Sequence, residues 1–407
     1  MGAKTPARFH HGFHLILPAE LLLFLLERLL FQSLYLPIQA ISAGLKRTSG
    51  IDRFRPMMRY FRSNIGAMAG YVPGEQPQAD GFIKLNTNEN PYAPSPKVCS
   101  ALRQAIAPSL RLYPEPLSDT LRSTAASVYG VKRSNVIVGN GSDELLSILL
   151  RCFVGSQDRV AFPTPTYSLY DTLVDIQDGI TVHVDFPPDF SVPESLAGQN
   201  AAVTFLCNPN APSGTLVSLP EVERLARAVS GILVVDEAYV DFAESEGASS
   251  IPLISRLPNL VVLRTFSKSY SLAGMRIGLA LASDEIISGM MKVKDSYNVN
   301  RLSMIAATAA LQDLAWMNRN VRRIQRGRKK LMTALRRLGY SVYPSHANFV
   351  LARKIGQNLK GVYEELKRRK ILVRYFDAPG LQDCLRITVG TPREIQVLLK
   401  EMAAIDD

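Results

Sequence analysis

The sequence predicts an α/β fold in which a mostly parallel central sheet is covered by helices and joined to a smaller α/β domain. The first observation is that short apolar runs alternate with helical stretches along residues 135–265, as in repeated β-α-β units. The second is size, because 407 residues with 47% hydrophobic side chains can form a large core and two domains. Sheets of this kind bind ligands at the carboxyl ends of their strands.

The expected elements follow one another along the chain. The expected strands are residues 83–85, 135–139, 159–162, 181–184, 201–207, 232–236 and 260–265. The expected helices are residues 94–107, 118–129, 142–153 (with Ser142 as its N-cap) and 219–230. After residue 297 a long helical region runs to residue 338. The smaller domain is predicted by strands at 341–343, 349–352 and 385–389 and by a helix near 359–369.

These elements divide the chain into four expected parts. They are an N-terminal extension of uncertain role (1–56), an arm joining the small domain (57–95), a large domain (96–299) and a small C-terminal domain (300–407). The extension is apolar, but its longest charge-free stretch, 29–45, contains Pro37 and is short for a membrane span. Three interpretations stay open for it: an extension without catalytic role, a membrane-surface or partner-binding helix, and a cleaved targeting segment. Membrane association is not the favoured one.

The net charge of +11 does not predict a nucleic-acid-binding protein. Lys and Arg concentrate in residues 1–65 and in a predicted helix at 319–337, without the basic and aromatic interleaving of single-strand binders. The four cysteines lie far apart and are expected to be reduced thiols of a cytoplasmic protein. The histidines are not spaced as metal ligands, so no metal site is expected.

Lys268 is the first candidate catalytic residue because of its position. The apolar run 260–266 predicts a buried strand, and Lys268 follows it between two serines. Burial disfavours the ammonium form, so a lysine at such a strand end can lose its proton and attack a carbonyl group. For this residue alone, a lysine whose charged end reaches water is the more ordinary interpretation, and the other residues of the chain reverse that preference.

Further polar residues follow the other predicted strands. The glycine-rich segment 139–144 opens a helix, whose free N–H groups and positive dipole end suit a phosphate. Asp236 ends a buried strand and needs a cationic partner, such as a protonated pyridine nitrogen. The remaining candidates are Tyr239 (a phenol), Tyr167 (an aromatic face) and Asn208 (an amide). Each has a structural alternative as a cap, core aromatic or turn former, but together with the lysine they are the groups that hold pyridoxal phosphate.

The segment 265–274 resembles the lysine signature of the class-II pyridoxal-phosphate aminotransferases, which have fold type I. From about Tyr71 to the C-terminus the chain is similar to the histidinol-phosphate aminotransferase family. The other segments that carry this similarity are 88–92, 113–116, 139–144, 208–210, 236–239 and 384–390. The chain departs from the family pattern at Ala211 and Ser213, where relatives usually have Asn and Thr. Neither change removes a cofactor contact that the resemblance implies.

The resemblance implies roles for these residues. Lys268 would carry pyridoxal phosphate as a Schiff base and move the substrate proton, with Asp236 at the ring nitrogen. Tyr239, the third expected catalytic residue, would bond the ring hydroxyl together with Asn208, and Tyr167 would stack on the ring. The expected phosphate-binding residues are Gly141, Ser142, Asp143, Ser267, Arg276 and, from the neighbouring subunit of a homodimer, Tyr113. The expected substrate contacts are Arg386 (a carboxylate), Arg374 and Tyr71 (a second anion) and Asn348 (the pocket wall).

The implied activity is transfer of an amino group from histidinol phosphate to 2-oxoglutarate in histidine biosynthesis, by a ping-pong mechanism through pyridoxamine phosphate. An aromatic amino-acid aminotransferase and a threonine-phosphate decarboxylase are alternatives of the same fold. A non-catalytic, membrane-tethered binding protein is the alternative from another class, suggested by the apolar N-terminus. A binding protein needs no Schiff-base lysine, which argues against it. The sequence leaves the amino donor open.

Overall fold

The computed structural model describes residues 2, 60–77, 79–106, 108–245 and 247–406. The chain divides into two units, Met1–Phe61 and Arg62–Asp407, and the description that follows is of the second. The extension expected at residues 1–56 lies outside the described residues, apart from Gly2. Its expected role and the proposed domain boundaries therefore stay predictions.

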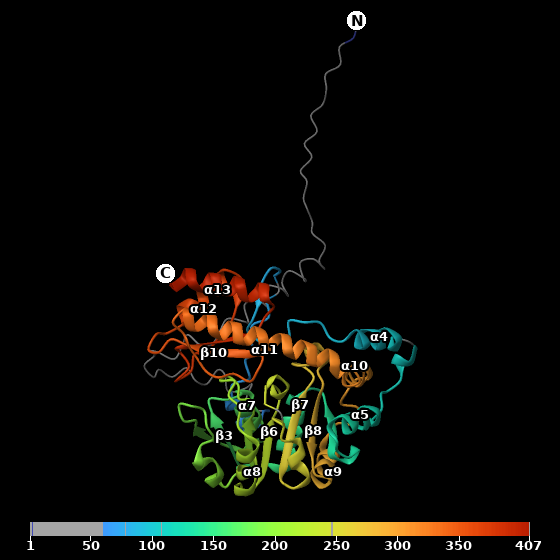
Figure 1. Ribbon diagram of the computed structural model, residues 1–407. Coiled ribbons are helices and arrows are strands. Elements are labelled where there is room, and N and C mark those ends of the chain that lie inside the picture. The colour runs from blue at the N-terminus through green and yellow to red at the C-terminus, as the bar shows by residue number, and fades with distance from the viewer. Residues whose placement is uncertain (1, 3–59, 78, 107, 246, 407) are drawn as a thin grey trace. The chain divides into compact units, whose positions relative to one another are not determined.

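The largest sheet has seven strands, in the order β2-β8-β7-β6-β5-β3-β4 (Figure 1). The strands are β2 (Val136–Gly139), β3 (Arg159–Thr164), β4 (Ile180–Asp185), β5 (Val203–Cys207), β6 (Ile232–Asp236), β7 (Leu260–Thr265) and β8 (Gly278–Ala282). All neighbouring pairs are parallel except those of β8, which runs antiparallel to β2 and to β7. The expectation of a mostly parallel central sheet is confirmed.

The central strands are buried along almost their whole length, which explains their apolar sequences. Every residue of β5 and β7 is buried, as are four of the five residues of β6. In the register of these strands, Asp236 lies beside Cys207 of β5 and beside Leu263 of β7. The polar residues that follow the three strands are therefore brought to one edge of the sheet.

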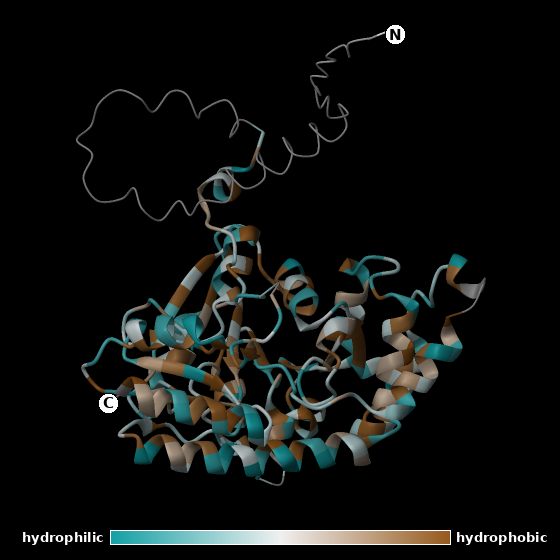
Figure 2. Cartoon of the chain, turned by 90° about the horizontal axis from the view of Figure 1, so that it is seen from above, coloured by the Kyte–Doolittle hydropathy of each residue, from teal (hydrophilic) through white to brown (hydrophobic). Residues whose placement is uncertain are grey.

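Helices cover the sheet and join it to the rest of the unit. They are α4 (Pro96–Ala105), α5 (Asp119–Tyr129), α6 (Ser142–Phe153), α7 (Leu169–Gln177), α8 (Leu219–Ala228), α9 (Asp284–Val293), α10 (Arg301–Leu311) and α11 (Leu314–Arg337). Helix α6 packs on β2, β7 and β8, α8 packs on β6, and α10 packs on α4 and α5. Hydrophilic and hydrophobic residues alternate along these helices, as expected for elements with one buried face (Figure 2).

The C-terminal part forms a second layer of structure. Its antiparallel sheet has the order β12-β13-β10-β9, with β9 (Ser341–Val342), β10 (Phe349–Arg353), β12 (Arg374–Tyr375) and β13 (Cys384–Thr388). Helices α12 (Lys360–Arg368) and α13 (Pro392–Asp406) pack on one another. The arm contributes a short helix α3 (Ser63–Ala67) and strand β1 (Ile83–Lys84), which pairs in parallel with β11 (Ile371–Leu372). The arm is thereby joined to the C-terminal part.

Some local expectations were wrong or incomplete. Helix α6 begins at Ser142, but its N-cap is Gly141, whose φ of 88° is readily adopted by glycine. The expected elements did not include strands β8, β11 and β12 or helices α3, α7, α9 and α13. In the part of the chain that the structure describes, no helix is both long enough and apolar enough to cross a membrane.

Candidate active site

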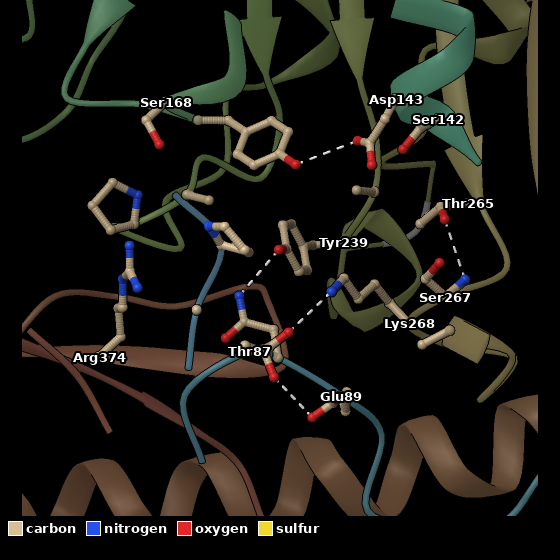
Figure 3. A pocket seen from close by; sticks show the side chains of 18 of the residues that line it. Thr87, Glu89, Ser142, Asp143, Ser168, Tyr239, Thr265, Ser267, Lys268 and Arg374 are labelled. Carbon is tan, nitrogen blue, oxygen red and sulfur yellow. Dashed lines mark hydrogen bonds between the residues drawn. The ribbon is translucent and has the colours of Figure 1, made fainter. Parts of the chain in front are cut away.

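A cavity of about 590 Å³ lies at the carboxyl ends of the central strands, between them and the C-terminal part (Figure 3). Its volume is in the range of small-molecule and cofactor sites. It brings together most of the predicted site residues: Tyr71, Ser142, Asp143, Tyr167, Asp236, Tyr239, Ser267, Lys268, Arg276, Arg374 and Arg386. Segments more than 300 residues apart in the sequence therefore meet in one site.

Lys268 reaches into this cavity from the loop after β7. Its Nζ donates a hydrogen bond to the Thr87 carbonyl oxygen (3.2 Å) and lies 5.7 Å from the centre of the Tyr239 ring. Figure 3 shows this amine pointing toward Thr87 beside Tyr239. Burial, together with the positive charge of the nearby Arg386 guanidinium, lowers the pKa of Lys268 to about 8. The amine can therefore lose its proton near neutral pH.

Asp236 is buried at the end of β6, with 3% of its surface exposed. Its Oδ2 accepts a hydrogen bond from the Tyr170 hydroxyl (2.9 Å), and its Oδ1 accepts one from the Ala238 amide (3.1 Å). Burial raises the pKa of Asp236 to about 6, although both hydrogen bonds act in the opposite direction. A positively charged ligand atom beside this carboxylate would favour its ionised form.

Two tyrosines form an aromatic and hydroxyl-bearing part of the wall. The Tyr239 hydroxyl oxygen accepts a hydrogen bond from Asn88 Nδ2 (3.0 Å), and burial raises the pKa of Tyr239 to about 12. Tyr239 is therefore a neutral phenol at physiological pH. The Tyr167 hydroxyl donates to Asp143 Oδ1 (3.3 Å). The Tyr167 ring makes an edge-on contact with the Tyr170 ring, with 5.5 Å between the ring centres and 81° between the ring planes, which holds Tyr167 beside the cavity.

The start of helix α6 forms an anion-binding corner of the cavity. Ser142 is the first helical residue, and Ser267 lies across from it on the cavity wall. Arg276 reaches the same corner, where its Nη2 donates to Asp143 Oδ2 (3.0 Å). Unpaired N–H groups at a helix N-terminus, two hydroxyls and a guanidinium together suit a phosphate group.

Gly278 permits this corner to form, and we predict a large effect of Gly278→Ala. A Cβ atom at this position would lie 2.7 Å from the Ser142 nitrogen and 2.9 Å from the Gly141 carbonyl carbon, both backbone atoms that cannot rotate away. We expect the free energy of unfolding to fall by about 2 kcal/mol. The affinity for pyridoxal phosphate should fall as well.

The matched control is Gly289→Ala in helix α9, where an added Cβ meets nothing within 4 Å. This change should be neutral or stabilise the protein by up to about 1 kcal/mol, because alanine favours helix. Chemical denaturation and cofactor titration measure both variants. Wild-type cofactor affinity in Gly278→Ala would contradict the close approach of β8 to the start of α6.

Two arginines lie at the opposite side of the cavity. Arg374 and Arg386 are directly opposed in the register of β12 and β13, and both line the cavity. Arg386 Nη2 donates to the Asn86 carbonyl oxygen (3.0 Å), whereas its Nε is buried without a hydrogen-bond partner among the described residues. Burial lowers the pKa of Arg386, and the charge of Arg374 adds to this effect. An anionic group between the two arginines would relieve both their repulsion and the unpaired Nε.

The structure does not bring every predicted residue to the cavity wall. Asn208 is not among the residues that line the cavity; its Oδ1 accepts from the Val217 N–H (2.8 Å), and its Nδ2 donates one of its two protons to the Val217 carbonyl oxygen (3.1 Å). Asn348 is buried one layer behind the wall and donates to the Asn88 carbonyl oxygen (2.8 Å). Tyr113 is 76% exposed and stacks on Tyr297 away from the cavity. The Gly141 amide is occupied by the Gly139 carbonyl oxygen (2.8 Å).

Sequence reasoning missed several residues of the wall. Asn86, Thr87, Asn88 and Glu89 all line the cavity. Residues 88–92 belong to the segments that carry the family resemblance, but the sequence suggests no role for them in the site. Tyr170, which donates a hydrogen bond to Asp236, lies in helix α7, and because this helix was not expected the sequence offered no signal for the contact. Metal ligation is a separate matter, since within the described ranges no three His, Cys, Asp or Glu side chains form a metal-binding group.

The cavity fits pyridoxal phosphate. Its walls carry an amine of lowered pKa, a buried carboxylate, a neutral phenol, an aromatic ring and an anion-binding corner, and its volume suits the cofactor. A protonated ring nitrogen would give Asp236 a positive partner, and the aldehyde of the cofactor would meet a lysine that can lose its proton.

The comparisons with known proteins agree with this chemistry. Residues 80–402 match the family model for aminotransferases of class I and II. The chain is 44% identical over 348 residues to histidinol-phosphate aminotransferase 1 of Nostoc sp., covering 85% of this chain and 98% of the relative. It is 46% identical to the histidinol-phosphate aminotransferase of Citrifermentans bemidjiense, covering 84% and 97%.

Among solved structures, the chain resembles histidinol-phosphate aminotransferase from Sinorhizobium meliloti in complex with pyridoxal-5′-phosphate. The TM-score is 0.80 at 26% identity, and the match covers 86% of this chain and 98% of the other. The resemblance noted in the sequence, the expected fold type and the expected cofactor are thereby confirmed. The chain belongs to the class I and II aminotransferase family and is a pyridoxal-phosphate-dependent transaminase.

Proposed function

We propose that this enzyme transfers the amino group of histidinol phosphate to 2-oxoglutarate, forming imidazole acetol phosphate and glutamate. The observation that carries the proposal is the pair Arg374 and Arg386, side by side on β12 and β13 at the cavity wall. Histidinol phosphate carries a phosphate and 2-oxoglutarate carries two carboxylates, so both substrates need cationic groups of this kind. The names and identities of the curated relatives support the same substrate pair.

The proposed mechanism assigns the cavity residues to separate tasks. Bound pyridoxal phosphate supplies an electron sink that makes the substrate carbon beside the amino group acidic. Lys268 would hold the cofactor and would move the proton from this carbon. Asp236 would keep the ring nitrogen protonated, and the Tyr239 phenol would donate to the ring hydroxyl oxygen. Tyr167 would cover the ring and keep water away from the reacting atoms.

The two ends of the cavity hold anions in this proposal. The corner of Ser142, Ser267 and Arg276 binds the cofactor phosphate, and Arg386 binds the carboxylate of the amino-acid substrate. Arg374 and Tyr71 take the second anion, which is the phosphate of histidinol phosphate or the distal carboxylate of glutamate. Asn208 is left out of this proposal because it is not among the residues that line the cavity.

The lowered pKa of Lys268 predicts the pH dependence of cofactor attachment. Only the neutral amine attacks the aldehyde, and burial places the pKa of Lys268 at about 8. The attachment rate of pyridoxal phosphate to cofactor-free protein should therefore rise about tenfold per pH unit below pH 8 and level off above it. Arg386→Gln should move this midpoint upward, because it removes a positive charge that lowers the pKa. Stopped-flow absorbance measures the rate, and a rise that continues to about pH 10 would show an ordinary lysine.

We propose a homodimer in which Tyr113 reaches the cofactor phosphate of the neighbouring subunit. The support is an apolar surface formed by exposed large side chains close in sequence: Ile106, Leu110, Leu112, Tyr113 and Leu117. Contiguous exposed apolar side chains are typical of interaction surfaces. Leu112→Glu should shift the protein to monomers in sedimentation experiments. The matched control is Ile355→Glu, which alters another exposed apolar side chain elsewhere and should leave the oligomeric state unchanged.

We propose the cytoplasm as the location of the enzyme. All four cysteines are free, and two of them, Cys207 and Cys384, are buried as thiols. Proteins of reducing compartments use cysteine in this way. Fractionation of cells that express the full chain tests this location, and it also tests the role of the N-terminal extension. Recovery of the active enzyme with the membranes would contradict the proposal.

Steady-state kinetics with a panel of amino donors test the proposed substrate. Histidinol phosphate, phenylalanine and glutamate are compared at the same concentration of a 2-oxo acid acceptor, and the keto product is measured. We expect kcat/KM for histidinol phosphate to exceed that for phenylalanine by at least about tenfold, since a phosphate bound by arginine contributes more than 1.4 kcal/mol. Preference for phenylalanine would instead indicate an aromatic amino-acid aminotransferase. Release of carbon dioxide from threonine phosphate would indicate a decarboxylase.

A further inference from the structure

Residues 86–90, here called the bridging loop, contact the functional residues from both sides of the cavity. The Asn86 carbonyl oxygen accepts from Arg386, and the Thr87 carbonyl oxygen accepts from Lys268 Nζ. At the end of the loop, Asn90 Nδ2 donates to the Lys268 carbonyl oxygen (3.0 Å). Among the described residues, the bridging loop thus forms hydrogen bonds with both the substrate-facing Arg386 and Lys268.

Asn88, in the centre of the bridging loop, uses every one of its polar atoms. Its N–H donates to Thr388 Oγ1 (3.0 Å), and its carbonyl oxygen accepts from Asn348 Nδ2 (2.8 Å). In the side chain, Oδ1 accepts from Thr388 Oγ1 (3.1 Å), and Nδ2 donates to the Tyr239 hydroxyl (3.0 Å). The residue is 1% exposed, with φ at 57°, a left-handed conformation that asparagine tolerates better than most residues. The hydrogen bonds therefore fix both the backbone and the side-chain orientation of Asn88.

These contacts fix the direction of the Tyr239 proton. Thr388 Oγ1 accepts the Asn88 N–H, so its own proton goes to Asn88 Oδ1 and the amide presents Nδ2 to Tyr239. A phenol has a single O–H to donate. Because the Tyr239 oxygen accepts from Asn88, its proton remains available for an acceptor in the cavity.

We propose that Asn88 is a positioning residue that acts through Tyr239. Asn88 donates a hydrogen bond to the Tyr239 oxygen. The hydroxyl hydrogen of Tyr239 is thereby directed toward the ring hydroxyl oxygen of pyridoxal phosphate. Thr388 holds the amide in the required orientation from strand β13, which also carries Arg386. This inference rests on the cofactor and not on the identity of the amino donor, so it can fail or hold independently of the proposed substrate.

The experiment compares Asn88→Gly, Tyr239→Phe and the double variant in the enzyme with cofactor bound. Glycine removes the amide but adopts the same positive φ without strain. The readout is the pH midpoint of the cofactor's visible absorbance change, which reports charge on the chromophore without turnover. Tyr239→Phe removes a hydrogen-bond donor to the ring oxygen. The protonated form of the cofactor should therefore persist to higher pH, and the midpoint should rise by about one pH unit. Asn88→Gly should move the midpoint in the same direction in the wild-type background and produce no further shift when Tyr239 is already phenylalanine.

A second variant and a control separate positioning from general stability. In Asn88→Asp, the introduced carboxylate would accept the Tyr239 proton and turn it away from the cavity, so the midpoint should rise at least as far as in Tyr239→Phe. Asn259→Asp changes another amide that bonds two backbone carbonyl oxygens outside the cavity, and it should lower the Tm without moving the midpoint. Equal shifts from Asn88→Gly with and without the phenol, or no shift with the phenol present, would overturn the proposal.

Discussion

Replacing Lys268 with alanine is expected to lower turnover by at least about 10³-fold, the largest effect of any single substitution in this enzyme. Removal of one positioned general base typically costs 10²–10⁴-fold, and this change also removes the group that attaches the cofactor. The structure places no other lysine on the wall of the cavity among the described residues. Turnover of histidinol phosphate and the visible absorbance of the purified variant measure the two losses separately.

The matched control is Lys329→Gln, which removes an exposed lysine that pairs with Glu244 on the surface of α11. It should change turnover by less than about twofold, because Lys329 does not line the cavity and its exposed ion pair contributes little to stability. Reduction of the wild-type enzyme with borohydride, followed by peptide mass spectrometry, should locate the trapped cofactor on Lys268. Trapping on another lysine, or near-normal turnover of Lys268→Ala, would contradict the assignment.

Asp236→Asn is expected to lower turnover by about 10²–10³-fold, comparable to loss of one preorganised electrostatic contact in other active sites. The two side chains have nearly the same shape, so the Tyr170 hydroxyl keeps a hydrogen-bond partner. The amide, however, has no negative charge with which to keep the cofactor's ring nitrogen protonated. Single-turnover absorbance measurements should show that proton removal from the substrate is slowed much more than substrate binding.

A cofactor analogue makes this prediction specific. Pyridoxal phosphate with a methyl group on its ring nitrogen is positively charged whatever residue lies beside it. We expect this analogue to restore part of the lost rate in Asp236→Asn, because its ring nitrogen is positively charged without a carboxylate beside it. Tyr170→Phe serves as the companion variant, because it removes one hydrogen bond to Asp236 but leaves the carboxylate. A full rate in Asp236→Asn with the ordinary cofactor would contradict the assigned role.

The central strands and the residues that follow them could be predicted because the local signal is strong. Continuous apolar runs that end abruptly in polar residues gave bounds for β6 and β7 identical to those observed. Burial on both faces produces such runs, and the parallel register then places Asp236 and the loop of Lys268 at one edge. Lys268 and Asp236 could therefore be proposed from the strand ends, whereas the roles of Arg374 and Arg386 followed only from the family resemblance.

Side-chain direction and long-range partners could not be predicted in the same way. Asn208 follows β5 as expected, but its amide bonds the backbone of Val217, nine residues ahead, and it is not among the residues that line the cavity. Strand β8 escaped notice because its Gly and Ala residues resemble a loop, although they are needed for close packing against the start of α6. The contact of Asn88 with Tyr239 joins residues 151 positions apart and exists only in the folded chain.

The most direct test of this account follows the two half-reactions by absorbance of the purified enzyme. Histidinol phosphate, glutamate and phenylalanine are each added alone to separate samples of the enzyme with pyridoxal phosphate bound. We expect histidinol phosphate and glutamate to remove the visible band rapidly, and 2-oxoglutarate to restore it, with phenylalanine markedly slower. Loss of the band with phenylalanine but not with histidinol phosphate would contradict the substrate assignment. Absence of any visible band would contradict the role of Lys268.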